Sequence, residues 1–259
     1  MRKIELEELK QIQLDILKEV HNFCVEHGLR YSLGGGTLLG AVRHKGYIPW
    51  DDDIDIMMPR PDYTVFVKEF NGYKPHLVCG AYENDKKYMY PFTKVYDNRT
   101  ILKAVKHIKP IGINIDVFPI DGFPESEKET EIFMRNYSLW RMLLYFKLVT
   151  GGTWKGKFMN FFTKLLPLSL IQKKLNKIIQ KYDFEKSLFT GAVCGSYLLK
   201  EKNPKFVFAE YVELPFENLK FKAIKQYDIY LLNHYGNYME LPPMDKRIAH
   251  HIEETFWKE

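Results

Sequence analysis

Four aspartates lie within five residues at 51–55, and three glycines at 34–36 precede them. Carboxylates this close together repel one another unless a cation or a proton lies among them. Glycines let the backbone approach a ligand closely and present its N–H groups to it. A phosphate beside a divalent metal ion would satisfy both features. The stretch from Gly34 to Asp55 therefore predicts metal-assisted chemistry on a phosphate group.

The spacing of the aspartates predicts that two of them share one face of a strand. If residues 54–58 form a strand, side chains alternate, so Asp53 and Asp55 point to one side while Ile54 and Ile56 point to the other. Two carboxylates on one face suit Mg²⁺, or Mn²⁺, which takes oxygen ligands from carboxylates, water and substrate phosphates. A solvated turn is the simpler alternative, but the aspartates run directly into an apolar strand. A calcium loop fits poorly, because Ile56 stands where that loop needs glycine.

A third carboxylate, Asp116, lies in the apolar segment 113–118. Alternation places Ile115 and Val117 in the core and Asn114 beside Asp116 on the opposite face. Seen alone, Asp116 is equally well explained as a hydrogen-bonded aspartate at a strand end. Together with the earlier pair it can close around one or two metal ions. We therefore predict that the metal ligands, which are also the catalytic residues, are Asp53, Asp55 and Asp116. Asp116 would complete the metal site or take a proton from the acceptor.

The glycines are expected to form a phosphate-binding turn. A short strand at 31–33, the glycines, and a helical turn at 37–42 would point backbone N–H groups and a helix N-terminus at an anion. We predict substrate contacts from Gly35, Gly36 and Thr37, and a guanidinium of Arg43 that forks onto a phosphate. The sequence matches neither the phosphate loop ending in Gly-Lys-Ser/Thr nor the dinucleotide fingerprint.

The remaining patterns predict helices and strands around these residues. Apolar residues three and four apart predict a helix from Leu9 to Phe23 that ends at Gly28 and packs beside the glycine turn. Further helices are expected at 61–70 and 223–234. Strands are expected at 77–79 and 88–96, with strand-like sequence at 205–216 and an extended segment at 241–243. The fold class is therefore α/β or α+β, with a mixed sheet flanked by helices.

Composition limits the kind of protein and its compartment. The 259 residues are 46% hydrophobic, which is enough for a sizeable core. Three widely spaced cysteines, Cys24, Cys79 and Cys194, indicate buried thiols in a reducing compartment and no disulfide framework or zinc site. The first ten residues carry acids where a signal peptide needs an apolar run, and no stretch reaches the length of a membrane span. We expect a cytoplasmic protein, soluble or peripheral to a membrane.

The middle of the chain is basic. Residues 132–182 contain ten lysines and arginines and no acid, so the rest of the chain carries a net charge of −5 within a total of +5. Aromatic and aliphatic residues alternate with these cations, which is typical of helices that lie on an anionic membrane surface. Helices that pack on the core with a solvated lysine face explain the pattern equally well. No nucleic-acid module is visible, so nucleic acid is not expected as a partner.

Several segments together resemble one family. The run from Gly35 to Tyr63, GGTLLGAVRHKGYIPWDDDIDIMMPRPDY, resembles the signature of the LicD family, phosphocholine transferases of the nucleotidyltransferase-like superfamily that are distantly related to fukutin-related transferases. Further matching segments follow in order across nearly the whole chain, at 93–100, 112–122, 235–238, 241–243 and 247–251. Residues 125–210 carry no segment that matches.

The resemblance implies a fold, a reaction and its partners. It implies a nucleotidyltransferase-like core, CDP-choline as donor, release of CMP, and Lys94 neutralising the donor's phosphates. The implied acceptor is a sugar hydroxyl of a cell-surface glycan, often lipid-linked, of the teichoic acid, lipopolysaccharide or capsule type. A place at the inner face of the cell membrane would follow. We expect a catalytic core at 1–124, a basic helical insertion at 125–204, and a C-terminal part at 205–259 that returns to the core.

Other functions remain open from the residues alone. A nucleotidyltransferase would use the same three acids but transfer the nucleotide itself. Transfer from another CDP-alcohol, carrying ribitol, glycerol or ethanolamine, would leave the metal site unchanged. A non-catalytic protein that binds membrane or nucleic acid would depend on the basic middle segment. His250 and His251 could touch a ligand, although structural or surface roles are the simpler expectation.

Overall fold

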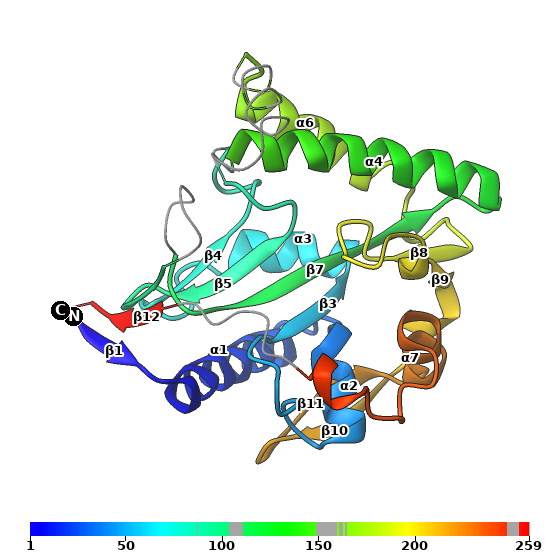
Figure 1. Cartoon of the computed structure of the whole chain (residues 1–259). Coiled ribbons are helices and arrows are strands. Elements are labelled where there is room, and N and C mark those ends of the chain that lie inside the picture. The colour runs from blue at the N-terminus through cyan, green and yellow to red at the C-terminus, as the bar shows by residue number, and fades with distance from the viewer. Residues whose placement is uncertain are drawn as a thin grey trace.

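A computed structural model describes residues 1–86, 88–103, 111–148, 160, 163, 165–247 and 254–258. Within them, the central sheet has seven strands, five of which follow the order β2-β3-β7-β5-β4, with β8 and β9 added at the end of β7 (Figure 1). Its strands are β2 (Ser32–Leu33), β3 (Asp55–Pro59), β4 (Leu77–Gly80), β5 (Thr93–Asp97), β7 (Asn114–Phe123), β8 (Phe189–Gly191) and β9 (Asn203–Pro204). Strands β3 and β7 are parallel and the other neighbours are antiparallel. The predicted α+β fold with a mixed sheet is confirmed.

Two smaller sheets flank the central one. The first has the order β1-β12-β6, so the two ends of the chain pair with each other (Figure 1). The second is an antiparallel hairpin, β10-β11, that lies against β2 and α2. The strands of these sheets are β1 (Arg2–Ile4), β6 (Thr100–Lys103), β10 (Tyr211–Phe216), β11 (Leu219–Ile224) and β12 (Glu254–Trp257).

Helices cover the central sheet and position its polar ends. Helix α1 packs against β5 and β7, α3 against β3 and β7, and α2 against β3 and the hairpin. The helices are α1 (Leu6–Glu26), α2 (Gly35–Arg43), α3 (Arg60–Glu69), α4 (Glu127–Leu148), α6 (Leu168–Ile179) and α7 (Tyr227–Tyr235), with the 3-10 turns η1 (Leu198–Glu201), η2 (Lys205–Phe208) and η3 (Met244–Lys246).

Helix α1 forms as its periodicity predicts. Leu9, Ile12, Val20 and Phe23 are all buried, and Gly28 follows the helix with a φ of +64° that favours glycine. The helix also buries a polar residue on its apolar face. The side chain of Gln13 donates hydrogen bonds to the backbone carbonyls of Asp52 (3.0 Å) and Asn114 (3.2 Å). The expectation that α1 only packs beside the glycine turn was therefore incomplete.

The buried side chains form two separate clusters. The larger cluster joins α1, α2, α3, the central sheet and the hairpin, and extends to Tyr238. The smaller cluster is formed mainly by α4 and α6, with Phe123 of β7 and Val193 after β8. It falls largely within the range predicted as an insertion, although β8 and β9 of that range join the central sheet. The proposed domain boundaries stay predictions.

Three predicted elements differ from the structure. The strand expected at 88–96 begins only at Thr93, after a loop of aromatic residues. The helix expected at 223–234 begins at Tyr227, because Ala223 and Ile224 belong to β11 and are buried against β10. Apolar spacing in this segment fits both periods, and pairing with β10 decides between them. Residues 205–208 of the expected strand-like segment form η2 instead.

All three cysteines are buried and free, as predicted. In the described part of the chain, no helix has the length and apolar character that crossing a membrane requires.

Candidate active site

The sheet brings the three predicted aspartates together. Asp55 on β3 and Asp116 on β7 are direct partners in the parallel register, and Lys94 on β5 faces Asp116 from the other side. Asp53 lies two residues before β3. The predicted alternation is confirmed, because Ile54, Ile56, Ile115 and Val117 are fully buried on the opposite face.

These carboxylates are held in an unfavourable environment. Burial raises the pKa of Asp53, and the charges of Asp51 and Asp116 raise it further. Burial, then Asp53 and Asp116, likewise raise the pKa of Asp55, with Lys94 acting in the opposite direction. The ammonium group of Lys94 thus faces several carboxylates, so the cluster would attract a further cation.

Lys94 is paired within this cluster. Its Nζ atom contacts Asp116 Oδ1 and lies 3.0 Å from Asn114 Oδ1. Burial alone would lower the pKa of Lys94, but the neighbouring Asp116 carboxylate raises it, so the ammonium stays charged. Asp116 therefore enters the site as half of an ion pair.

The fit of a metal ion can be judged from the donor set. In the described residues, no group of three or more His, Cys, Asp or Glu side chains is arranged to hold a metal ion. Asp53 and Asp55 nevertheless offer oxygen donors whose mutual repulsion a hard cation would relieve, so the chemistry of the pair fits Mg²⁺.

The glycine turn lies directly beside the acids. Gly34 caps α2 and its N–H donates to the carbonyl of Asp55 (2.9 Å). Gly35 has a φ of +46°, and a Cβ atom there would lie 3.2 Å from Asp55 Oδ2. A Cβ atom at Gly36 would lie 2.7 Å from Asp51 Oδ2. The carboxylates approach the turn so closely that only hydrogen atoms fit between them.

Thr37 positions an aspartate. Its hydroxyl accepts a hydrogen bond of 2.8 Å from the backbone N–H of Asp55, and its side chain is buried. The substrate contact predicted for Thr37 stays a prediction, because the residue does not line the cavity described next.

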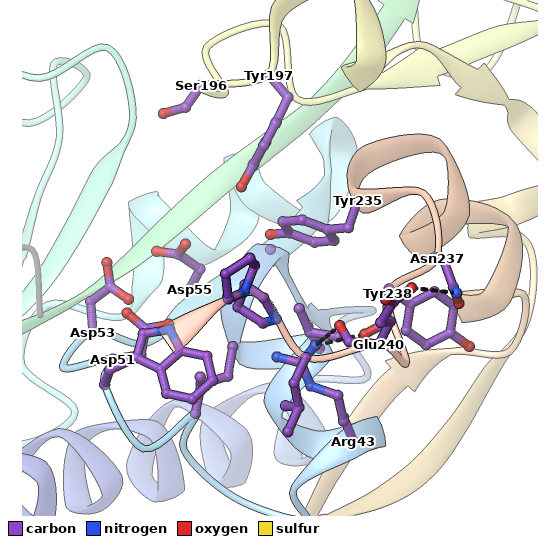
Figure 2. A pocket seen from close by; sticks show the side chains of 18 residues that line it. Arg43, Asp51, Asp53, Asp55, Ser196, Tyr197, Tyr235, Asn237, Tyr238 and Glu240 are labelled. Carbon is purple, nitrogen blue, oxygen red and sulfur yellow. Dashed lines mark hydrogen bonds between the residues drawn. The ribbon is translucent and has the colours of Figure 1, made fainter. Parts of the chain in front are cut away.

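A cavity of about 700 Å³, here called the glycine-turn pocket, opens beside the acids (Figure 2). Its wall combines the glycines, three aspartates, aromatic rings and the segment after α7. The lining residues are Gly35, Gly36, Leu39, Arg43, Ile48, Trp50, Asp51, Asp53, Asp55, Ser196, Tyr197, Tyr235, Asn237, Tyr238, Glu240, Leu241, Pro242 and Pro243. Its volume lies within the range of pockets that bind cofactor-sized ligands.

Arg43 holds the far side of this pocket in place. Its Nη1 donates to the carbonyls of Tyr238 (2.7 Å) and Glu240 (3.3 Å), as Figure 2 shows. Arg247 adds a second guanidinium, 5.4 Å above the ring of Trp50. Burial, then Arg247, lowers the pKa of Arg43 from its high ordinary value. Two guanidinium groups near one pocket favour an anionic ligand.

Known proteins resemble this chain in sequence. Residues 28–147 match a family described as LicD/FKTN/FKRP, nucleotidyltransferase domain. The chain is also 33% identical, over 99% of its length and 99% of the relative's, to the lipopolysaccharide cholinephosphotransferase LicD of Haemophilus influenzae. The chain belongs to the LicD family.

Two further similarities cover shorter stretches of the chain. The chain is 31% identical over 138 residues, 49% of its length and 40% of the relative's, to an uncharacterised protein of Rickettsia typhi. It is 62% identical over 29 residues to the human protein named ribitol 5-phosphate transferase FKRP. This stretch covers 11% of the chain and 6% of that protein. Membership of the LicD family makes the chain a transferase, so a purely non-catalytic role is set aside.

The LicD-family site includes residues that the sequence did not assign. Ser196 and Tyr197 come from the middle segment, where no local pattern marked them. Tyr235 and Pro242 lie in segments that carried the family resemblance without an assigned role, so that resemblance was the available signal. Figure 2 shows Tyr197 and Tyr235 projecting their hydroxyls toward the side where Asp55 lies.

A buried network ties these residues to the glycine turn. Glu201 accepts a hydrogen bond from the backbone N–H of Tyr197 (3.2 Å), and its Oε2 lies 3.1 Å from His234 Nε2. His234 Nδ1 bonds the carbonyl of Tyr230 (2.9 Å), whose hydroxyl accepts the N–H of Gly35 (3.3 Å). The middle segment and α7 are thus joined to the turn through hydrogen-bonded side chains.

The predicted substrate-binding residues divide between two places. Gly35, Gly36 and Arg43 line the glycine-turn pocket, whereas Lys94 lies behind the acids. His250 and His251 lie outside the described residues.

Proposed function

We propose that this chain transfers phosphocholine from CDP-choline to a sugar hydroxyl of a cell-surface glycan and releases CMP. One observation carries the proposal: Asp55 and Asp116 are direct partners across β3 and β7, beside a glycine turn and a large pocket. The name of the Haemophilus relative, lipopolysaccharide cholinephosphotransferase, supports phosphocholine as the transferred group and a lipopolysaccharide as acceptor. Teichoic acids and capsule glycans offer the same kind of hydroxyl.

Asp53 and Asp55 would hold Mg²⁺, or Mn²⁺, with Asp116 as a third ligand or as proton acceptor. When bound, the ion would neutralise charge on the diphosphate of the donor. The raised pKa values of Asp53 and Asp55 support this role, because they reflect burial first and then repulsion among neighbouring aspartates, and a bound cation would offset both. The start of α2 and the hydroxyls of Tyr197 and Tyr235 supply hydrogen-bond donors for phosphate oxygens.

The bonds of the proposed reaction balance without another reactant. The acceptor oxygen bonds to the phosphorus of phosphocholine, and the bond from that phosphorus to the bridging oxygen of CMP breaks. The acceptor's proton passes to a carboxylate, for which Asp116 is the candidate. Catalysis in such a reaction is mainly positioning and neutralisation of charge, so the rigid sheet that carries the acids is well suited to it.

Two alternatives concern the group that is transferred. The short match to a protein named ribitol 5-phosphate transferase favours ribitol among the other CDP-alcohols; glycerol and ethanolamine remain. A nucleotidyltransferase would instead attach the nucleotide to the acceptor with the same three aspartates. Neither alternative changes the metal site.

The test is release of CMP by the purified protein with Mg²⁺ across CDP-choline, CDP-ribitol, CDP-glycerol and CDP-ethanolamine. We expect the largest kcat/KM with CDP-choline. A donor labelled separately in its cytidine and choline halves identifies the half that reaches the acceptor. Silence with every donor, or transfer of cytidine, would overturn the proposal.

We also propose that the protein works in the cytoplasm at the inner face of the cell membrane, where α4 and α6 contact anionic lipid. Helix α4 has a second apolar stripe on its outer face, where Ile132, Leu139 and Met142 are 40–52% exposed. The outer face of α6 carries exposed Lys173, Lys174 and Lys177. Exposed apolar side chains and exposed cations both favour binding to an anionic lipid surface, and a lipid-linked acceptor would be found there.

A further inference from the structure

A second cavity lies behind the acids, and it shares a wall with the glycine-turn pocket. This cavity, here called the Lys94 cavity, has a volume of about 230 Å³, and its polar lining includes Gln13, Asp53, Tyr90, Lys94, Asn114 and Asp116. Among the residues that the structure describes, Asp53 alone lines both spaces. A phosphate held at Asp53 would therefore adjoin both cavities.

We infer that the acceptor sugar binds in the Lys94 cavity and attacks from the side opposite the nucleotide. The inference rests on the proposed function, in which a phosphate ester is transferred to a hydroxyl. In phosphoryl transfer the attacking and leaving oxygens lie roughly in line, on opposite sides of phosphorus. If CMP leaves into the glycine-turn pocket, the hydroxyl must arrive on the opposite side of phosphorus. The Lys94 cavity is the other space that reaches Asp53.

The sizes of the two cavities agree with this division. The glycine-turn pocket, at about 700 Å³, lies inside the range of 300–1,000 Å³ typical of drug-sized and cofactor-sized ligands. The Lys94 cavity, at about 230 Å³, lies below that range and suits a single sugar unit better than a nucleoside diphosphate ester.

The lining of the Lys94 cavity has the chemistry that a sugar needs. Asp116 offers carboxylate oxygens to a sugar hydroxyl, and the Lys94 ammonium beside it can donate to a sugar oxygen. The ring of Tyr90, 4.9 Å from Lys94 Nζ, and the side chain of Leu9 supply an apolar surface for the carbon face of the sugar. A flexible ligand without hydroxyl groups would cover these polar side chains without offering them hydrogen bonds, which is unfavourable.

The same arrangement assigns separate roles to Asp116 and Lys94. As the acceptor oxygen bonds to phosphorus, its proton passes to Asp116, and the electron pair of the breaking bond leaves with CMP. Lys94 contacts Asp116 and Asn114 and holds the carboxylate toward the cavity. Asp116 is thus the catalytic residue of the acceptor side, and Lys94 is its positioning residue.

The inference is tested by separating the donor and acceptor halves of the reaction. Tyr90→Ala opens the Lys94 cavity, and Trp50→Ala is the matched change in the glycine-turn pocket; both side chains are only partly buried. We expect Tyr90→Ala to raise KM for the acceptor at least tenfold while KM for CDP-choline, and CMP release without acceptor, change less than twofold. Trp50→Ala should do the reverse. A rise in donor KM for Tyr90→Ala, or equal losses in both halves, would overturn the inference.

A binding measurement covers the case in which no donor turns over. Methyl hexopyranosides serve as acceptor probes, and ligand-detected NMR reports their binding to the protein with Mg²⁺, first without CMP and then with saturating CMP. We expect binding that CMP does not displace and that Tyr90→Ala abolishes while Trp50→Ala leaves it intact. Displacement by CMP, loss only in Trp50→Ala, or no binding to the unaltered protein would overturn the second site. Failure of the proposed function alone would show as absent CMP release with glycoside binding unchanged.

Discussion

Like charges are arranged in opposite ways in the acidic site and in the α4–α6 region. At the site, Asp53, Asp55 and Asp116 are drawn together by a rigid parallel strand pair, against their own repulsion. In the α4–α6 region, like charges are spread along an outer helix face, where water screens them. The first arrangement costs folding free energy and is worth keeping only for chemistry. The second costs little and suits reversible contact with a surface.

Replacing either Asp53 or Asp55 should give the largest effect. Asp53→Asn and Asp55→Asn keep the side-chain shape but remove the charge, so we expect kcat to fall on the order of 10³-fold. Glu69→Gln, on the exposed face of α3, is the control and should change nothing. CMP release provides the measurement. Activity within tenfold of the unaltered protein would mean that the acidic cluster is only structural.

Breaking the buried ion pair between β7 and α3 should cost the most stability. Asp121 on β7 is fully buried and pairs with Arg60 at the start of α3, with Arg60 Nε 2.7 Å from Asp121 Oδ1. Asp121→Asn leaves a buried guanidinium without its partner charge, so we expect a loss of about 3 kcal/mol in the free energy of unfolding. Urea denaturation measures it. Glu254→Gln, in an exposed pair with Lys103, should cost less than about 1 kcal/mol.

Removing charge from α6 should weaken lipid binding without changing the chemistry. Lys174→Gln with Lys177→Gln removes two exposed cations, each worth about 1 kcal/mol at an anionic surface, so we expect roughly 30-fold weaker binding to phosphatidylglycerol vesicles. Lys220→Gln with Lys225→Gln on the hairpin is the matched control. Vesicle cosedimentation reports the result. Equal losses in both pairs would indicate a non-specific charge effect, and tighter binding of RNA than of vesicles would favour nucleic acid as the partner.

The smallest predicted effect concerns stability and pH. The raised pKa of Asp55 means that the folded protein binds its proton more tightly than the unfolded chain does. Its contribution to stability is therefore present below the ordinary aspartate pKa and is lost as pH rises through the raised value. With a chelator at pH 8, Asp55→Asn should melt a few degrees higher than the unaltered protein, at about 2–4 °C for each kcal/mol.

This stability difference should shrink as the pH falls through the raised pKa of Asp55, where the carboxyl group takes up its proton. Mg²⁺ should raise the melting temperature of the unaltered protein but not that of Asp55→Asn. Calorimetry at several pH values measures both trends. A variant that melts lower at pH 8 would contradict the proposed repulsion.

The parts of the site that follow local rules were predictable from the sequence. The period of two in Asp53-Ile54-Asp55 and in Asn114-Ile115-Asp116 fixed which side chains share a face. The glycines before a helical segment indicated the turn. The meeting of Asp116 with Asp55 was inferred from shared chemistry, and the parallel pairing of β3 with β7 provides it.

The parts that depend on distant contacts were not predictable. Tyr197 reaches the pocket because Glu201 accepts a hydrogen bond from its backbone N–H, and His234, distant along the chain, bonds Glu201 in turn. The pairing of Ala223 and Ile224 with β10 overrode a helical pattern. Gln13 looked like an interruption of an apolar helix face, yet it joins two loops of the site through their carbonyls. Each case depends on tertiary contacts that no single segment specifies.

The glycine turn limits which variants of this protein can survive. A methyl group at Gly36 would need the space of a carboxylate oxygen of Asp51, and one at Gly40 would lie 2.4 Å from the backbone carbonyl oxygen of Gly46. At Gly40 the obstacle is backbone, which cannot move aside as a side chain can, so glycine to alanine there should destabilise the fold. At Gly36 the obstacle is the end of the Asp51 side chain, so a methyl group would push that carboxylate out of its place in the pocket wall.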